Sequence, residues 1–370
     1  MPSPDGRPLC AAGRLPFGLR KGERSLENEA YMACGLVLDP VFLKHENPAG
    51  HPERPERVGV LLDRLVSPPA GWIRIPPPAA RDEDLLRVHD FAYLARLKKA
   101  AERPLCALDP DTYTSPGTWE SAAAAAGGSV RLAEEVVDGS VSAGIALVRP
   151  PGHHAERDRA MGFCLLNNAA IAAEWARREA ALRKVAVVDF DVHHGNGTQA
   201  AFWRRADVLY VSTHQYPFYP GTGALTEVGE ASGEGFTVNF PLSRGKDDGF
   251  YSALYRRMVV PILREYGPEL IIVSAGYDAD TRDPLGGMKL TPAGFAAVTE
   301  ALCRTAREVA DGRICFLLEG GYDLDALLDG VMATMRSIEG EAAPVLEGGE
   351  EFEEYRRRVL GGLQRWWKSL

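Results

Sequence analysis

Short apolar runs alternate along the chain with longer segments in which apolar residues recur at the spacing of a helix. Several of the short runs are almost continuously apolar, which is typical of parallel strands covered by helices on both faces. The predicted strands are residues 35–39, 144–148, 185–191, 208–213, 236–240, 270–275 and 314–319. The predicted helices are residues 82–101, 116–137, 167–184, 249–266, 292–311 and 324–338.

This alternation runs through the chain without a linker between two series of elements and without an internal repeat. It predicts one α/β domain with a central, mostly parallel β-sheet flanked by helices. Residues 1–30 are polar, rich in Pro and Gly and aperiodic, and are expected to form a loose N-terminal arm before a catalytic domain at 31–370. The acidic stretch 347–354 and the following residues 355–370 are expected to form a C-terminal helix that docks on the body, with contact to a partner or a membrane as the alternative.

Composition narrows the function classes. Hydrophobic residues make up 45% of the chain and charged residues 25%, as in ordinary globular proteins. A net charge of −9 makes unspecific nucleic-acid binding a poor expectation. No apolar run approaches the ~18 residues of a membrane span, so no membrane partner is expected. The six cysteines are scattered without a Cys-x-x-Cys pair, which favours reduced thiols and a cytoplasmic location.

The least ordinary residues follow four of the predicted strands. The segments are residues 149–154, 189–197, 276–280 and 319–322, and two of them hold the tandem histidine pairs His153-His154 and His193-His194. Because ligands and catalytic groups collect at the carboxyl ends of strands in α/β proteins, these segments are expected to form one site.

Two of these segments carry candidate metal ligands. Alternation along an extended chain places Asp189, Asp191 and His193 on one face, with Asp191 and His193 ~6.6 Å apart. Asp278, after another apolar strand, can add a third ligand. Two carboxylates and one imidazole would bind a divalent cation and leave a coordination position open, as in catalytic sites. Burying these charges unpaired would be costly, which disfavours capping roles alone.

The residues after the histidine pair in the same loop bear on whether the site would hold one metal ion or two. A dinuclear centre needs additional carboxylates, but Gly195 and Asn196 follow the histidine pair and neither is an anionic ligand. One ion is therefore favoured, while Asp280 keeps the dinuclear alternative open.

Six segments in this order resemble the zinc-dependent histone deacetylase family, which includes bacterial deacetylase-like amidohydrolases and acetylpolyamine amidohydrolases. They are RPPGHHAE (149–156), GFCLLNN (162–168), DFDVHHGNGT (189–198), STH…FYPGTG (212–223), SAGYDA (274–279) and LEGGY (318–322). The segment HENPAGHPERPER (45–57) is similar to the class II branch. The resemblance covers about residues 35–340 and implies an arginase-like α/β domain around a parallel sheet.

The resemblance implies a metal set and a catalytic set. Asp191, His193 and Asp278 would hold one Zn²⁺ per chain. His153 would pair with Asp189 and act electrostatically, whereas His154 would pair with Asn196 and shuttle the proton. Tyr322 would donate its hydroxyl to the substrate carbonyl. A K⁺ site is implied at Asp189, Asp191, the His193 carbonyl, Ser212 and Thr213.

The resemblance also implies a narrow tunnel for the substrate chain. Phe163 and Tyr219 would be its aromatic walls, and Gly162 would let the backbone approach the substrate. A rim aspartate would hold the substrate backbone, with Asp109 and Asp111 as the two alternatives.

Two positions bear on the branch of the family that the chain resembles and on whether it is expected to hydrolyse its substrate. Asn196 stands where class I members have an aspartate, as in class II, so His154 would be less basic. Tyr322 is present where the weakly active class IIa enzymes have histidine. Hydrolytic deacetylase chemistry is therefore expected.

Substrate choice is expected to depend on Leu285, because polyamine-selective relatives look to place a glutamate there. Leucine favours an acyl-lysine in a peptide or protein. Two alternatives remain: an amidohydrolase for acetylated polyamines or another small amide, and a non-catalytic acyl-lysine binder. The binder is disfavoured because every acid, base, ligand and oxyanion group is present. Acyl length and oligomeric state are left open.

Overall fold

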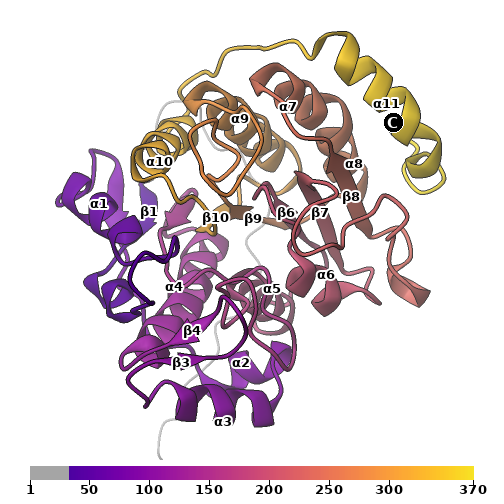
Figure 1. Ribbon diagram of the computed structural model, residues 1–370. Helices are drawn as coiled ribbons and strands as arrows, with labels where there is room; N and C mark the ends of the chain where they lie inside the picture. The colour runs from indigo at the N-terminus through magenta and orange to yellow at the C-terminus, as the bar shows by residue number, and fades with distance from the viewer. Residues whose placement is uncertain (1–32) are drawn as a thin grey trace, which may run out of the picture. The chain divides into compact units, whose positions relative to one another are not determined.

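Eight strands form one sheet in which every hydrogen-bonded neighbour is parallel, with the order β2-β1-β5-β10-β9-β6-β7-β8 (Figure 1). The computed structural model describes residues 33–370. The sheet strands are β1 Cys34–Val37, β2 Trp72–Arg74, β5 Gly144–Ala146, β6 Val185–Asp189, β7 Val208–Gln215, β8 Thr237–Leu242, β9 Leu270–Ala275 and β10 Ile314–Leu318. A short antiparallel ribbon joins β3 Cys106–Ala107 to β4 Tyr113–Thr114.

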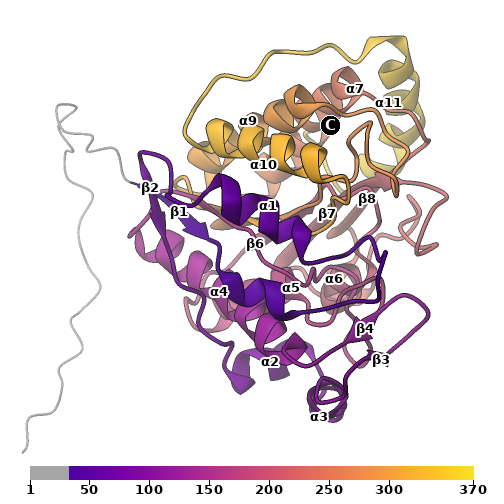
Figure 2. The ribbon, with the colours of Figure 1, turned by 60° about the vertical axis from the view of Figure 1, so that its left-hand side comes forward.

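Helices cover both faces of this sheet, with α9 and α10 on one face and α4 and α5 on the other (Figures 1 and 2). The α-helices are α1 Glu56–Arg64, α2 Asp82–Val88, α3 Phe91–Ala100, α4 Thr118–Asp138, α5 Asn168–Arg178, α6 Asn196–Phe202, α7 Asp248–Leu254, α8 Val260–Tyr266, α9 Pro292–Val309, α10 Leu324–Ile338 and α11 Gly349–Leu363. Single 3₁₀ turns lie at η1 Pro40–Lys44 and η2 Ala231–Gly233. The predicted α/β domain around a parallel sheet is confirmed.

Each predicted strand occurs, and the central strands β6, β9 and β10 are buried at every residue, as their apolar runs require. The strand predicted at 185–191 ends sooner, at Asp189. The Asp191 N–H leaves the ladder and donates to the Asp189 carboxylate at 3.2 Å, which turns the chain into the following loop. Strands β2, β3 and β4 were not predicted, because two or three residues are too few to show a pattern.

The single helix predicted at 82–101 is wrong, because α2 and α3 are separated at His89 and Asp90. Both residues are extended, with ψ of 148° and 142°. The ring of His89 lies 2.9 Å from the Glu156 carbonyl and 2.9 Å from the Asn167 N–H, which fixes it to other segments. Tertiary hydrogen bonds therefore override the helical pattern here.

Two further helices differ from expectation. The helix predicted at 249–266 contains a π-helical turn, η3 Tyr255–Val259, between α7 and α8. The C-terminal helix is α11, which lies within the predicted 347–370 but ends at Leu363, with Glu350 and Glu351 in its first turn, where the helix dipole favours acidic residues. The expected docking is present, since Trp367 is 5% exposed and contacts Phe236 with ring centres 6.0 Å apart.

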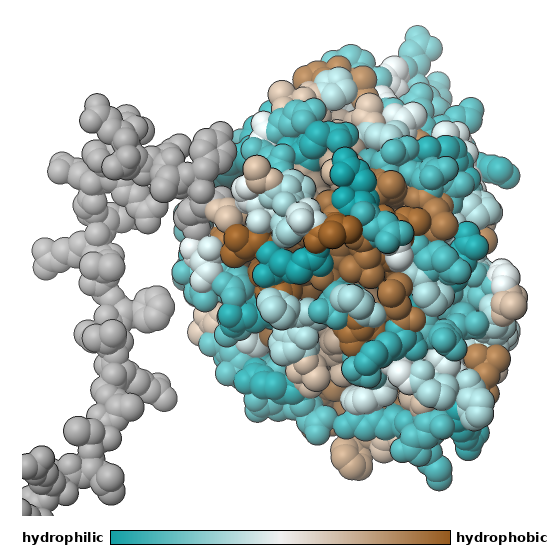
Figure 3. All heavy atoms as spheres, turned by 90° about the vertical axis from the view of Figure 1, so that its left-hand side faces the viewer, coloured by the Kyte–Doolittle hydropathy of each residue, from teal (hydrophilic) through white to brown (hydrophobic). Residues whose placement is uncertain are grey.

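The predicted N-terminal arm, 1–30, lies outside the described residues. Among residues 33–370, no helix is both long and apolar enough to cross a bilayer. Figure 3 shows one face of the molecule, on which hydrophilic residues surround a group of hydrophobic ones.

Candidate active site

The three expected metal ligands meet at the carboxyl edge of the sheet. Asp191 and His193 lie in the loop after β6, and Asp278 lies in the loop after its neighbour β9. Their ligand atoms all lie within 4.8 Å of one another. His193 Nδ1 is 3.2 Å from Asp191 Oδ1 and 3.1 Å from Asp278 Oδ2. Both aspartates are fully buried and His193 is 8% exposed.

The backbone holds both carboxylates in place. The Gly320 N–H donates to Asp191 Oδ2 at 2.8 Å, and the Val192 N–H donates to Asp278 Oδ1 at 2.9 Å. A Cβ at Gly320 would lie 2.1 Å from Asp278 Oδ2. Glycine is therefore required there, because any side chain would displace a carboxylate.

The charges of this cluster favour a cation. Burial and the charge of Asp191 raise the pKa of Asp278 to about 7. Burial alone would lower the pKa of His193, but its hydrogen bonds to Asp191 and Asp278 outweigh burial and raise it to about 10. Burial would raise the pKa of Asp191, but the charges of His153 and His193 hold it well below its usual value. A divalent cation fits this set, because it would accept one nitrogen and two oxygen ligands.

The aspartate that kept a dinuclear centre open does not join the cluster. Asp280 faces Arg282, with Oδ1 3.0 Å from Nε and Oδ2 3.2 Å from Nη2. Asp280 therefore adds no fourth ligand to the cluster of Asp191, His193 and Asp278, which fits a mononuclear site there.

The tandem histidines stand beside the ligand cluster with their rings 4.0 Å apart. His153 Nδ1 is 3.0 Å from Asp189 Oδ2, and His154 Nδ1 is 2.8 Å from Asn196 Oδ1. These are the two pairings that the resemblance implied. The Tyr210 hydroxyl also donates to Asp189 Oδ2, at 3.1 Å.

The two histidines differ in charge. Burial opposes protonation of His153, but the carboxylates of Asp191 and Asp189 outweigh it and raise its pKa to about 10. The pKa of His154 is held well below its usual value by burial, and then by the charges of His153 and His193. His154 is therefore the neutral imidazole, the form that can accept a proton.

Tyr322 lies after β10, on the same edge, and is 8% exposed. Burial raises the pKa of its hydroxyl well above the usual value, so the group stays a neutral donor. Asp283 Oδ2 accepts hydrogen bonds from the Tyr322 N–H at 2.6 Å and the Asp323 N–H at 3.2 Å. Arg57 lies over the tyrosine ring, 4.9 Å from its centre.

Glu319, Asp283 and Glu53 support the site but were not assigned roles from the sequence. Glu319 accepts the N–H groups of Gly152 and His153 at 2.6 and 3.1 Å, and so holds the histidine loop against β10. Burial raises the pKa of Glu319 to about 7. The residues around them in the sequence did not indicate which groups these three carboxylates would bond.

Phe163 and Tyr219, the two residues expected to form the tunnel walls, lie beside Tyr322 and His154. The rings of Tyr219 and His154 are 5.1 Å apart, and those of Phe163 and Tyr322 are 5.7 Å apart. Gly162 has φ +55°, and a Cβ there would lie 2.5 Å from the His154 ring. Its backbone therefore lies against the ring of His154, a contact that was not predicted from the sequence.

The rim beside Phe163 is built from residues 109–112 and His51. Thr112 Oγ1 accepts the Phe163 N–H at 3.0 Å, and His51 Nε2 lies 3.0 Å from the Asp111 carbonyl. The Thr112 hydroxyl in turn donates to Asp111 Oδ1 at 3.0 Å. Of the two candidate rim aspartates, Asp111 is therefore the one linked through Thr112 to Phe163.

Leu285 is half-buried, and its N–H donates to Asp283 Oδ1 at 2.9 Å. The loop that carries Leu285 is thus tied to the aspartate that also holds Tyr322.

The residues implied for K⁺ are neighbours at the ends of β6 and β7. Ser212 pairs with Asp189 across the two strands. The Thr213 hydroxyl donates to the Asp189 carbonyl at 3.4 Å. Asp191 and His193 follow directly in the loop.

A family model that matches this chain and two of its relatives are all described as deacetylases. The family model described as histone deacetylase domain matches residues 51–338. Histone deacetylase 5 of Arabidopsis thaliana is 37% identical over 364 residues, which are 91% of this chain and 54% of that protein. The polyamine deacetylase HDAC10 of Homo sapiens is 39% identical over 318 residues, which are 82% of this chain and 47% of that protein. The chain thus spans about half the length of both.

A solved structure has the same architecture. The HDA15 HD domain superposes with a TM-score of 0.85 at 36% identity, and the match covers 91% of this chain and 97% of that one.

Proposed function

The chain belongs to the histone deacetylase family, and we propose that it is a zinc-dependent amidohydrolase that removes acetyl groups from the ε-amino group of acyl-lysine. The observation that carries the proposal is the cluster of Asp191, His193 and Asp278, whose ligand atoms lie within 4.8 Å of one another beside a histidine pair and a tyrosine hydroxyl. Five cysteines of residues 33–370 are free thiols, which supports a reducing compartment such as the cytoplasm.

In this proposal, Asp191, His193 and Asp278 hold one Zn²⁺ per chain. When bound, zinc polarises a carbonyl and lowers the pKa of water. The adjacent Asp189, Ser212 and Thr213 would contribute to a K⁺ site behind the ligand loop.

The two histidines divide the proton transfers between them. His154 is neutral and bonded through Nδ1 to Asn196, so Nε2 is free to accept the proton of the attacking water. The same nitrogen then returns that proton to the leaving amine. His153 remains charged against Asp189 and stabilises negative charge that develops in the site.

Tyr322 serves as the oxyanion donor. Its hydroxyl stays protonated because burial raises its pKa, so it can donate to the carbonyl oxygen as negative charge develops. Asp283 and Arg57 hold the backbone and the ring of Tyr322, so the donor is oriented before the substrate arrives.

The substrate chain would pass between Phe163 and Tyr219. Two aromatic walls accept a slender alkyl chain and exclude branched side chains by shape. Leu285 offers no charge to a substrate ammonium, which favours acyl-lysine. Asp111 would hold the peptide backbone at the rim.

Acetylated polyamines are the second candidate substrates, because one relative with 39% identity is named a polyamine deacetylase. A panel of acyl-lysine peptides and N-acetylpolyamines, assayed side by side with the purified protein, distinguishes the two. We expect faster turnover of acetyl-lysine peptides and loss of activity after chelation. Faster turnover of acetylpolyamines would reverse the substrate assignment, and no turnover of either class would refute the proposal.

A further inference from the structure

We infer that Glu156 is a positioning residue that orients the Asn196 amide and, through it, fixes which ring nitrogen of His154 carries the proton. The inference rests on the proposed function, in which His154 is the proton shuttle. It adds a residue that acts on the shuttle without touching the substrate.

The contacts of Asn196 show one end of its amide facing His154 and the other facing acceptors. Oδ1 lies 2.8 Å from His154 Nδ1. Nδ2 donates to Glu156 Oε1 at 2.8 Å, and also lies 3.4 Å from the His154 carbonyl and 3.3 Å from Met161 Sδ. Only the carboxylate offers a short, charged hydrogen bond, and such bonds are the strong ones. Asn196 is 6% exposed, so water has little access to replace this partner.

The orientation decides the chemistry because the two ends of an amide have the same shape but opposite hydrogen-bonding character. With Oδ1 toward His154, the proton sits on Nδ1 and the lone pair of Nε2 can accept a proton. With the amide rotated by half a turn, Nδ2 would donate to Nδ1 and the proton would sit on Nε2. The shuttle would then be blocked at its reactive nitrogen. An aspartate would need no such control, since both of its oxygens accept.

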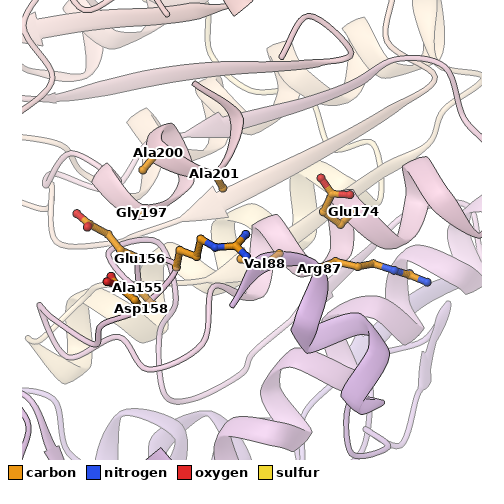
Figure 4. A pocket seen from close by; sticks show the side chains of 10 residues that line it. Arg87, Val88, Ala155, Glu156, Asp158, Glu174, Gly197, Ala200 and Ala201 are labelled. Atoms are coloured by element: carbon orange, nitrogen blue, oxygen red, sulfur yellow. The ribbon is translucent and has the colours of Figure 1, made fainter. Parts of the chain in front are cut away.

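Glu156 is itself held in place by its own loop. Arg159 donates to the carboxylate through Nε at 3.0 Å and Nη2 at 2.8 Å. The Glu156 N–H donates to the Arg159 carbonyl at 3.0 Å, and the Glu156 carbonyl faces His89 at 2.9 Å. Figure 4 shows Ala155, Glu156 and Asp158 close to Gly197, the residue that follows Asn196 at the start of α6. The carboxylate is 24% exposed, so a substitution there is less disruptive than one in the core.

A double-mutant cycle tests the inference. Glu156→Gln should lower kcat for an acetyl-lysine peptide by roughly tenfold, with KM changed less than about twofold, because Asn196 Nδ2 loses its charged acceptor and the amide is held less firmly in one orientation. In an Asn196→Asp background, the same Glu156→Gln change should cost nothing or raise kcat, since it removes one of two adjacent carboxylates. Asp158→Asn is the matched control: it makes the same charge change on the same loop, and this carboxylate has no hydrogen bond within residues 33–370.

A readout that needs no activity is the tautomer of His154, measured by ¹⁵N–¹H NMR of imidazole-labelled protein with and without zinc. The wild type should show the Nδ1–H form, and Glu156→Gln should populate the Nε2–H form. Zinc content and thermal midpoint should stay at wild-type values. Equal losses of kcat in both Asn196 backgrounds, or an unchanged tautomer, would overturn the inference. An inactive wild type with the expected tautomer shift would refute the proposed function and leave the positioning role of Glu156 standing.

Discussion

Glu53 and Arg149 form an ion pair in which neither side chain has any exposed surface. The Nη2 group of Arg149 donates to Glu53 Oε2 at 2.9 Å, and Nε donates to Oε1. Arg57 joins the pair, with Nη1 3.2 Å from Glu53 Oε1. Because Arg149 lies four residues before His153, this pair fixes the loop that carries Glu53 against the segment that carries His153 and His154.

Glu53→Gln leaves the buried guanidinium of Arg149 without its counter-charge, so the free energy of unfolding should fall by about 3–5 kcal/mol. Urea unfolding of the zinc-loaded protein measures the change. Glu120→Gln, which breaks the exposed pair with Lys44, is the control and should change the free energy by less than about 1 kcal/mol. Similar losses in the two variants would show that the buried pair has no special role.

Removal of a ligand should remove both metal and activity. Asp278→Ala deletes one of three ligands whose atoms lie within 4.8 Å, so bound zinc should fall from one per chain to near zero, with turnover below detection. Metal analysis after dialysis measures the amount of zinc bound per chain. Asp280→Asn, next in the loop but bonded to Arg282, should keep its zinc. A metal-free preparation that still hydrolyses acetyl-lysine would disprove the metal assignment.

The hydroxyl of Tyr322 should matter for turnover alone. Tyr322→Phe keeps the ring under Arg57 but removes the donor, so kcat should fall roughly 10²–10³-fold while zinc content and substrate affinity stay the same. Steady-state kinetics combined with equilibrium binding of a peptide separates the two effects. Unchanged kcat would exclude Tyr322 from the reaction.

Leu285 should set the preference between substrate classes. Leu285→Glu introduces a carboxylate that can meet a substrate ammonium, so the ratio of kcat/KM for N-acetylspermidine to that for an acetyl-lysine peptide should rise by roughly 10-fold or more. Leu285→Gln controls for polarity without charge. If both variants keep the wild-type ratio, selectivity is determined by other residues.

His89 should make stability depend on pH. Burial lowers its pKa to about 4, whereas the unfolded chain has the ordinary value of 6.5. Between pH 6.5 and 4 the unfolded state therefore binds a proton that the folded state cannot. As the pH is lowered through this range, the contribution of His89 reduces the free energy of unfolding by up to about 3 kcal/mol. The stability lost in His89→Gln at pH 7 should accordingly shrink at pH 4. Urea unfolding at both pH values measures this, and a constant difference would contradict it.

The sequence predicted the sheet and the meeting of Asp191, His193 and Asp278 because both depend on local signals. Continuous apolar runs identify strands covered on both faces, and β6, β9 and β10 are buried throughout. Asp191 and His193 share a loop, and Asp278 follows another apolar strand, so their approach required only that the two strands end at the same edge.

The break at His89 and the course of α11 were not predictable in this way, because each depends on a distant partner. His89 leaves the helical pattern to bond with Glu156 and Asn167, and Trp367 docks against Phe236. The periodicity of apolar residues shows which face of a helix or strand is apolar. It does not show which other element packs against that face.

The amino-acid sequence by itself therefore determined the kind of fold and which residue types follow the central strands, while the resemblance carried by its motifs gave the expected ligand set and catalytic groups. Only the tertiary structure decided that Asp280 turns to Arg282, that Asp283 holds Tyr322, and that Glu156 faces Asn196. The physical reason is that these hydrogen bonds join separate loops, whose mutual approach is set by the order of the strands in the sheet and by side-chain packing between them.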